Sequence, residues 1–194
     1  MKKVPAKTLV FALALAPAFA FASEKKAENA TMSDERLVTI LHQTNQAEIA
    51  AGKLAQQKGT SADVKNLGEK LVADHTKADD DVLAAADKAG VKPNPSSLSA
   101  HDKQMQQTDK KKMDQMKKLS GSEFDKAFAQ EMSRDHDHMI SMLKDAKTHV
   151  SPPIRELVDN TIPVLEQHKD LADKASKSAD RGTAKGRAPE PVKR

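Results

Sequence analysis

Apolar side chains recur at steps of three and four residues in the segment 64–82, at Val64, Leu67, Leu71, Ala78 and Val82. This spacing places them on one face of a helix, and such a face is typical of a side buried in a protein core. His75 falls on the same face, four residues after Leu71 and three before Ala78. The pattern therefore predicts a buried helix that carries an ionisable side chain where a leucine would be expected.

Similar stripes predict three more long helices, so that the four cover about 34–58, 61–89, 122–150 and 154–176. Capping residues mark several of their ends: Ser33 or Asp34 before the first, Gly59 after it, and Ser122 before the third. Pro163 lies inside the fourth stripe and is expected to kink that helix rather than end it.

The connector between the second and third helices, residues 90–120, separates two predicted helical hairpins. Asn94 to Ser97 is expected to be a loop, and 99–118 has a weaker amphipathic pattern. An up-and-down bundle needs only a short loop here, whereas a long connector can carry the chain back along the bundle, as in ferritin-like folds. No strand pattern occurs in the sequence. We therefore predict an all-α, ferritin-like four-helix bundle at 33–176, with a long crossover that contains a short extra helix.

The N-terminal residues 1–22 have the pattern of a secretory signal peptide. A positive start, Met1-Lys2-Lys3, precedes an apolar run from Leu9 to Phe21, and small residues around Ala20 and Ala22 suit signal peptidase. The run is too short to span a membrane comfortably. The chain contains no cysteine, which excludes a lipoprotein anchor, disulfides and thiolate metal sites. These features predict a periplasmic or secreted protein that has no transmembrane span after the signal peptide is cleaved. Residues 23–32 are expected to form a flexible N-terminus.

The charge of the chain is unevenly distributed. Residues 23–176 contain 23 Lys and Arg against 26 Asp and Glu, so this part is mildly acidic although the whole chain carries a net charge of +4. Residues 177–194 contain six basic residues against two acidic ones and have no periodicity, which predicts a disordered basic tail able to touch anionic envelope polymers. With no Trp or Tyr and five Phe, the sequence lacks the stacking residues of a nucleic-acid-binding surface.

Each long helix places one unusual residue on or beside its stripe: Glu48, His75, His136 and His168. Glu48 lies about 12 residues before the first hairpin turn and His75 about 15 after it, which at a rise of about 1.5 Å per residue gives nearly equal heights. His136 and His168 match in the same way around the second turn. The spacing therefore predicts one polar layer in the middle of the bundle.

Three imidazoles and a carboxylate can bind a divalent transition metal such as iron, zinc, copper or manganese. Asp74 and Asp135 each precede a histidine of the layer, so they are candidates for supporting contacts or further ligands. The alternative is a metal-free network around Glu48 that fixes the register of the helices. No phosphate-binding loop, nucleophile elbow or paired catalytic acids occur in the sequence, so no enzymatic activity is predicted.

Two pairs of methionines have helical spacing, Met113 with Met116 and Met139 with Met142. Their thioethers can bind Cu(I), but the pattern is more typical of side chains that fill gaps in a core.

The chain resembles the bacterial family of the domain of unknown function numbered 4142. The resemblance rests on an ordered set of segments: Asn45-Gln46-Ala47-Glu48-Ile49, Leu71 to Lys77, Ser120 to Phe128, Asp135-His136, and Ile162 to His168. Members of that family are grouped with ferritin-like folds and labelled as outer membrane proteins, so the resemblance implies such a fold and export. It implies no activity.

The chain also departs from di-iron ferritins. Their Glu-x-x-His pattern is absent, because Val72 stands three residues before His75 and Leu165 three before His168. Ferroxidase chemistry is therefore not expected by analogy.

Overall fold

The computed structural model of the protein describes residues 32–185, with side chains as far as residue 180. The predicted signal peptide, residues 23–31 of the predicted flexible N-terminus and the last nine residues of the predicted tail lie outside these described residues. Every element within them is helical: α1 (Asp34–Lys58), α2 (Ala62–Ala89), the 3₁₀ helix η1 (Pro95–Ser97), α3 (Ala100–Met116), α4 (Gly121–Ala146) and α5 (Pro152–Lys185). The prediction of an all-α bundle is confirmed.

The first helix begins after Ser33 and ends before Gly59, as its capping residues predict. The Ser33 hydroxyl accepts a hydrogen bond from the Arg36 amide at 3.2 Å, and Ser61 accepts one from the Val64 amide at the same distance. Gly90 closes α2 in the left-handed conformation, with a φ of 70°, which glycine adopts without the steric cost of a Cβ.

The α1–α2 hairpin is held together by a close backbone approach. A Cβ on Gly52 would lie 2.7 Å from the carbonyl oxygen of Gly68, and a Cβ on Gly68 would lie 2.7 Å from that of Gly52. Glycine within a helix costs up to about 1 kcal/mol relative to alanine. At these two positions the absence of a side chain allows the helices to pack directly against each other.

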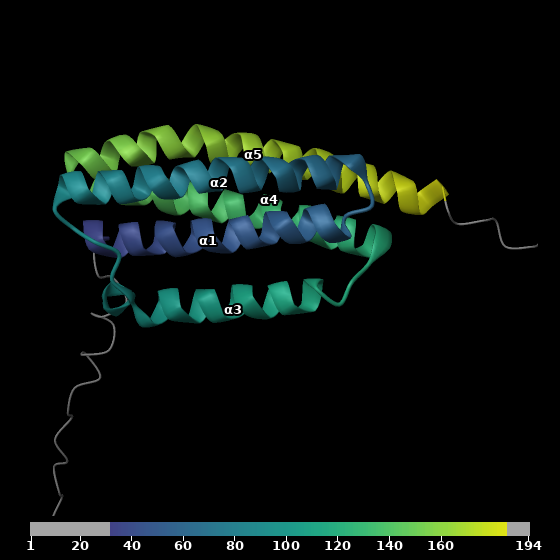
Figure 1. Cartoon of the computed structure of the whole chain (residues 1–194), viewed down its shortest axis with the longest axis horizontal. Coiled ribbons are helices and arrows are strands. Elements are labelled where there is room, and N and C mark those ends of the chain that lie inside the picture. The colour runs from purple at the N-terminus through teal and green to yellow at the C-terminus, as the bar shows by residue number, and fades with distance from the viewer. Residues whose placement is uncertain (1–31, 186–194) are drawn as a thin grey trace, which may run out of the picture. The chain divides into compact units, whose positions relative to one another are not determined.

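The connector carries the chain back along the bundle. In Figure 1, α3 runs beside α1, so that α4 begins at the end of the bundle where α2 also begins, and α2 and α4 run in the same direction. Met116 is the one buried residue of α3. An ion pair between Arg36 Nε and Asp102 Oδ2, 2.7 Å apart, ties the first turn of α3 to α1. A long crossover with a short helix is therefore present, while the assignment to the ferritin-like group stays a prediction.

Several predicted boundaries are wrong. Residues 95–97 form a turn of 3₁₀ helix rather than a loop, because the Asn94 side chain accepts a hydrogen bond from the Ser96 amide and caps that turn. The third long helix begins at Gly121, with Ser120 rather than Ser122 at the N-cap position, and it ends at Ala146 rather than near 150.

The last helix also extends further than predicted. It continues to Lys185, into the segment expected to be a disordered tail. Ala179 is buried, and Asp180 pairs with Lys126 of α4 at 2.6 Å. Packing against α4 therefore orders a stretch whose composition alone favours disorder.

The apolar core forms two clusters with a polar layer between them. One cluster contains Leu37, Val82, Leu143 and Ile154, and the other contains Leu67, Phe124, Phe128 and Ala172. On each long helix a buried polar side chain falls between the residues of the two clusters: Glu48 on α1, His75 on α2, His136 on α4 and His168 on α5.

Among the described helices, none has both the length and the apolar character that crossing a membrane requires.

Candidate metal centre

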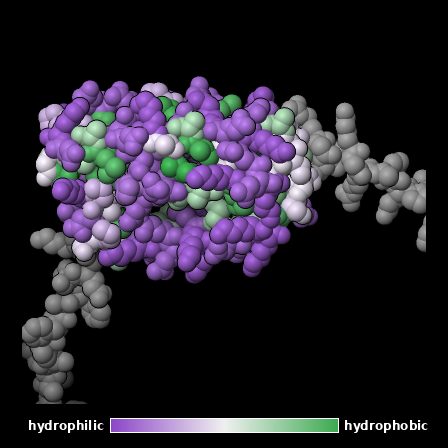
Figure 2. Space-filling model, in the orientation of Figure 1, coloured by the Kyte–Doolittle hydropathy of each residue, from purple (hydrophilic) through white to green (hydrophobic). Residues whose placement is uncertain are grey.

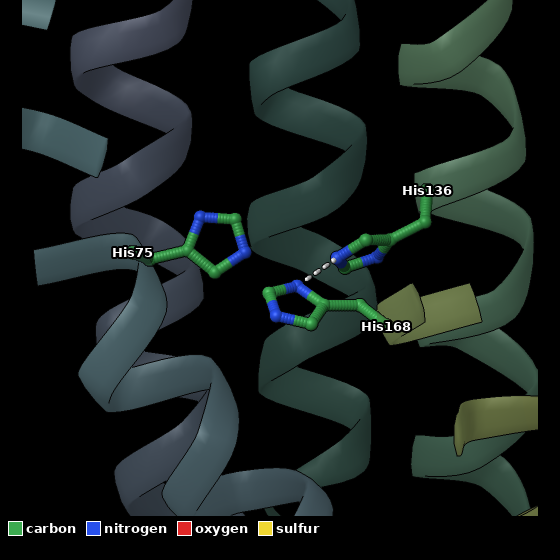
Figure 3. A group of neighbouring side chains, drawn as sticks. All are labelled: His75, His136 and His168. Atoms are coloured by element: carbon green, nitrogen blue, oxygen red, sulfur yellow. Dashed lines mark hydrogen bonds between the residues drawn. The ribbon is translucent and has the colours of Figure 1, made fainter. Parts of the chain in front are cut away.

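Three helices bring His75, His136 and His168 together in the middle of the bundle (Figure 3). The side chains come from α2, α4 and α5, and their exposed fractions are 4%, 2% and 0%. The ring centroids lie 5.2 to 5.7 Å apart. One nitrogen from each ring lies within 4.8 Å of the other two, which is the arrangement of a candidate three-histidine metal site.

In each ring, the nitrogen on the far side from the other two histidines forms a hydrogen bond with a residue outside the group. The Met132 carbonyl oxygen lies 2.8 Å from His136 Nδ1, and Asp74 Oδ2 lies 2.8 Å from His168 Nε2. Because a carbonyl and an ionised carboxylate only accept hydrogen bonds, both ring nitrogens must be the donors. His75 Nδ1 lies 2.9 Å from the Asn45 side-chain oxygen, which likewise makes this nitrogen the donor.

These contacts leave the remaining nitrogen of each neutral ring without a proton. His136 Nε2 and His168 Nδ1 face each other at 3.3 Å (Figure 3), and His75 Nε2 has no hydrogen-bond partner among the described residues. Two neutral rings in these tautomers have no proton to share across that contact. Three lone pairs therefore converge on one buried region, where a cation is the group that would satisfy them all.

Burial keeps the rings neutral. Desolvation, together with the neighbouring His136 and His168, lowers the pKa of His75 to about 3. Desolvation also lowers the pKa of His136 to about 4. It lowers the pKa of His168 as well, although the hydrogen bond to Asp74 opposes this effect. The rings are therefore uncharged at neutral pH, each with one nitrogen that carries no proton, and this is the state that binds metal ions.

Glu48 lies in the polar layer but not within the histidine group. The group of nitrogens within 4.8 Å of one another contains the three histidines only. Glu48 instead lines a cleft between α1, α3 and α4 together with Asp109 and Asp135, and its Oε2 has no hydrogen-bond partner among the described residues. Burial first, and then the charges of Asp135 and Asp109, raise its pKa to about 8. Glu48 therefore lies between the two core clusters, at the level of the histidines, but its carboxyl does not join their group of nitrogens.

The two predicted supporting aspartates have different environments. Asp74 accepts the hydrogen bond from His168, across the helix interface, and is also paired with Lys70 Nζ at 2.7 Å. Although burial opposes it, these two contacts lower the pKa of Asp74, so its carboxylate is ionised when it orients the imidazole. Asp135 lies 3.5 Å from Lys112 Nζ, and burial and the nearby Glu131 raise its pKa. No hydrogen bond joins Asp135 to a histidine of the group among the described contacts.

Asn45 is a site residue that the sequence did not identify. It stands three residues before Glu48 on α1 and is 5% exposed, so it lies on the buried face of that helix. A buried amide on an apolar stripe was an available signal, since such a group needs a polar partner. Its side-chain oxygen fixes the His75 ring, which is the supporting role that the prediction gave to an aspartate.

Two cavities have histidines of the group in their lining. The first, of about 500 Å³, is lined by Asp74, His75 and His168. The second is the α1/α3/α4 cleft, of about 680 Å³, and it is lined by His75 and His136. Both cavities therefore border the histidine group, while the rings themselves stay buried.

Comparison with known proteins gives a family but no function. A family model described as "Domain of unknown function (DUF4142)" matches residues 19–175. No curated protein and no solved structure matches the chain.

Proposed function

The chain belongs to the DUF4142 family, whose description states no activity, and we propose from its buried histidines that it binds a transition metal ion through His75, His136 and His168. The observation that carries this proposal is the convergence of three unprotonated ring nitrogens, each oriented by a hydrogen bond on the far side of its ring. Such outer contacts are the usual companions of metal-binding histidines.

The shortest nitrogen separation supports tetrahedral coordination. A zinc ion bound about 2.05 Å from two imidazole nitrogens at the tetrahedral angle holds those nitrogens about 3.4 Å apart. His136 Nε2 and His168 Nδ1 are 3.3 Å apart. The separation therefore matches the one that such an ion requires, and His75 completes a three-nitrogen set when its ring moves towards the ion.

The proposed site has an open coordination position. Three protein ligands leave a fourth position for water or another small ligand, as in zinc sites of the three-histidine type. Because no carboxylate of the described residues belongs to the ligand group, the three donors are neutral and do not reduce the charge of the bound ion. Such a site suits the binding, storage or sensing of an ion such as zinc, copper, iron or manganese.

We place this function in the bacterial envelope as part of the proposal. The signal-peptide pattern of residues 1–22 is the feature that favours export. The competing function is that of a metal-free structural or interaction protein of the envelope, in which the histidine layer only sets the register of the helices.

Metal binding can be measured directly on protein without a polyhistidine tag. We expect the purified wild-type protein to bind one equivalent of Co(II), with the visible absorption of a four-coordinate ion, and to compete for Zn(II) in the same way. The His75→Ala/His168→Ala double variant is expected to lose this binding. His149→Ala is the matched control, because His149 is exposed and lies outside the group.

Thermal unfolding provides a second test. A ligand present at about 100 times its dissociation constant stabilises the folded state by about 2.7 kcal/mol, which for a protein of this size raises the melting temperature by about 5–10 °C. Only trace metal in both wild type and double variant, with no increase in melting temperature on adding metal, would favour the metal-free function.

A further inference from the structure

The α1/α3/α4 cleft has an unusual apolar lining. Of the eight methionines in the chain, five line it: Met105, Met113, Met116, Met132 and Met139. Leu165 is the one other apolar side chain larger than alanine among the described residues of the lining. The cleft reaches His75 and His136, so the thioethers and two of the site's imidazoles share one continuous space.

Four of these methionines also take part in core packing: Met116 and Met132 belong to one core cluster, Met113 packs against that cluster, and Met139 packs against the other. Packing alone, however, does not require methionine at these positions. The two core clusters of the same bundle are built mainly from leucine, isoleucine, valine, phenylalanine and alanine. In α3, every apolar residue larger than alanine is a methionine, and all three of these line the cleft. Leucine would fill a similar volume with a better-defined shape, so packing alone does not require methionine at each position.

The cleft is also open to solvent. Met116 is the one buried residue of α3, and α3 lies along the outer side of α1 (Figure 1). In the space-filling view, a hollow with apolar side chains at its rim lies above the row of hydrophilic side chains along the lower edge, where α3 runs (Figure 2). An ion from solution can therefore meet the thioethers before it meets the buried imidazoles.

Thioether sulfur is a soft ligand that selects Cu(I) over the harder divalent ions, and imidazole also binds copper. We propose that this methionine-lined cleft is the path by which monovalent copper reaches the three-histidine group, with the thioethers as transient ligands. The inference rests on the proposed metal site and specifies which ion the site receives. The ion passes from sulfur to nitrogen ligands and stays monovalent, so the step involves no electron transfer.

The direct test uses Ag(I), a soft monovalent ion that is stable in air, and the full-length protein labelled with ¹³C at its methionine methyl groups. We expect Ag(I) to shift the methyl resonances of the five cleft methionines. Met142 and Met32 lie outside the cleft lining and are the internal controls. Unchanged cleft resonances, or equal shifts for the controls, would overturn the proposal.

A variant separates thioether chemistry from packing. Met105→Leu/Met113→Leu/Met139→Leu keeps the apolar volume and removes three sulfurs, and Met142→Leu is its matched control. We expect the triple variant to take Cu(I) from a chelator at least about tenfold more slowly, with Co(II) affinity unchanged. A wild-type rate in the triple variant, or an equal loss in Met142→Leu, would refute the role of the cleft.

The two proposals fail in different ways. If wild-type protein binds no Co(II) and no Cu(I), the metal site itself is wrong. If Co(II) binds at the histidines while Ag(I) leaves the cleft methyl groups unchanged, only the path for monovalent copper is wrong.

Discussion

Replacing Glu48 by glutamine is expected to stabilise the protein at alkaline pH and to have little effect near pH 4. The buried carboxyl of Glu48 has a pKa of about 8 in the folded protein, against an ordinary value of 4.5. Below the ordinary value the group is protonated in both states. As the pH rises from there towards 8, the unfolded chain loses the proton while the folded protein retains it, so stability falls; above 8 it falls no further.

The size of the effect follows from the pKa difference. Each pKa unit corresponds to about 1.4 kcal/mol, so the Glu48 side chain lowers the free energy of unfolding by about 3 kcal/mol at pH 7 and by about 5 kcal/mol above pH 8, relative to its value at acid pH. A glutamine amide of nearly the same shape has no charge to bury. The stability difference between Glu48→Gln and wild type is therefore expected to grow with pH and then level off.

Urea unfolding at pH values from about 4 to about 9 measures this difference. Glu69→Gln on α2 is the matched control, because Glu69 is exposed and its side chain remains in solvent when the chain folds. A stability difference for Glu48→Gln that is the same at every pH, or that decreases as the pH rises, would show that the Glu48 carboxyl is not buried in its neutral form.

Three further predictions concern the site and the packing beneath it. Asp74→Asn removes the carboxylate that orients His168, so Co(II) affinity is expected to fall by about 10- to 100-fold in a spectroscopic titration, without loss of the fold by circular dichroism. The pKa values of His75 and His136 are lowered to about 3 and 4, so Co(II) is expected to stay bound at pH 5.5, where ordinary histidines are mostly protonated. An absorbance titration that shows Co(II) release near pH 6.5 would contradict the lowered pKa values. Gly68→Ala is expected to destabilise the protein by about 1–3 kcal/mol in urea unfolding, because the added methyl group meets the Gly52 carbonyl oxygen of α1. An unchanged midpoint of the urea transition would count against the close approach of the two helix backbones.

The fold was largely predictable because local signals agree with the final packing. The stripes of three and four residues identify the buried faces of α1, α2, α4 and α5, and Ser33 and Gly59 mark the two ends of α1. The errors lie where tertiary contacts override composition. Residues 177–185 read as a polar tail, but the contact between Asp180 and Lys126 and the burial of Ala179 extend α5 through them.

The site was predictable in height but not in rotation. Periodicity and helix length place Glu48 in the same layer as the three histidines, because the rise per residue is fixed. Which way each side chain points around the helix axis depends on how neighbouring helices pack. On α1 it is Asn45 that forms the hydrogen bond with His75, while Glu48 stays outside the histidine group. The partner of Asp74 was missed for the same reason, since it is His168 of α5, 94 residues away.

The sequence by itself determined the helices, their buried faces and the level at which ionisable groups interrupt the core, because these properties depend on residue spacing along a helix of fixed geometry. Only the tertiary structure decided that three imidazoles bring one nitrogen each into a common group while the carboxyl of Glu48 stays outside it. It also decided that methionines distant in sequence line one cleft that reaches those imidazoles. The physical reason is that side-chain convergence depends on the rotation and separation of packed helices, and these are set by contacts between segments that no local pattern encodes.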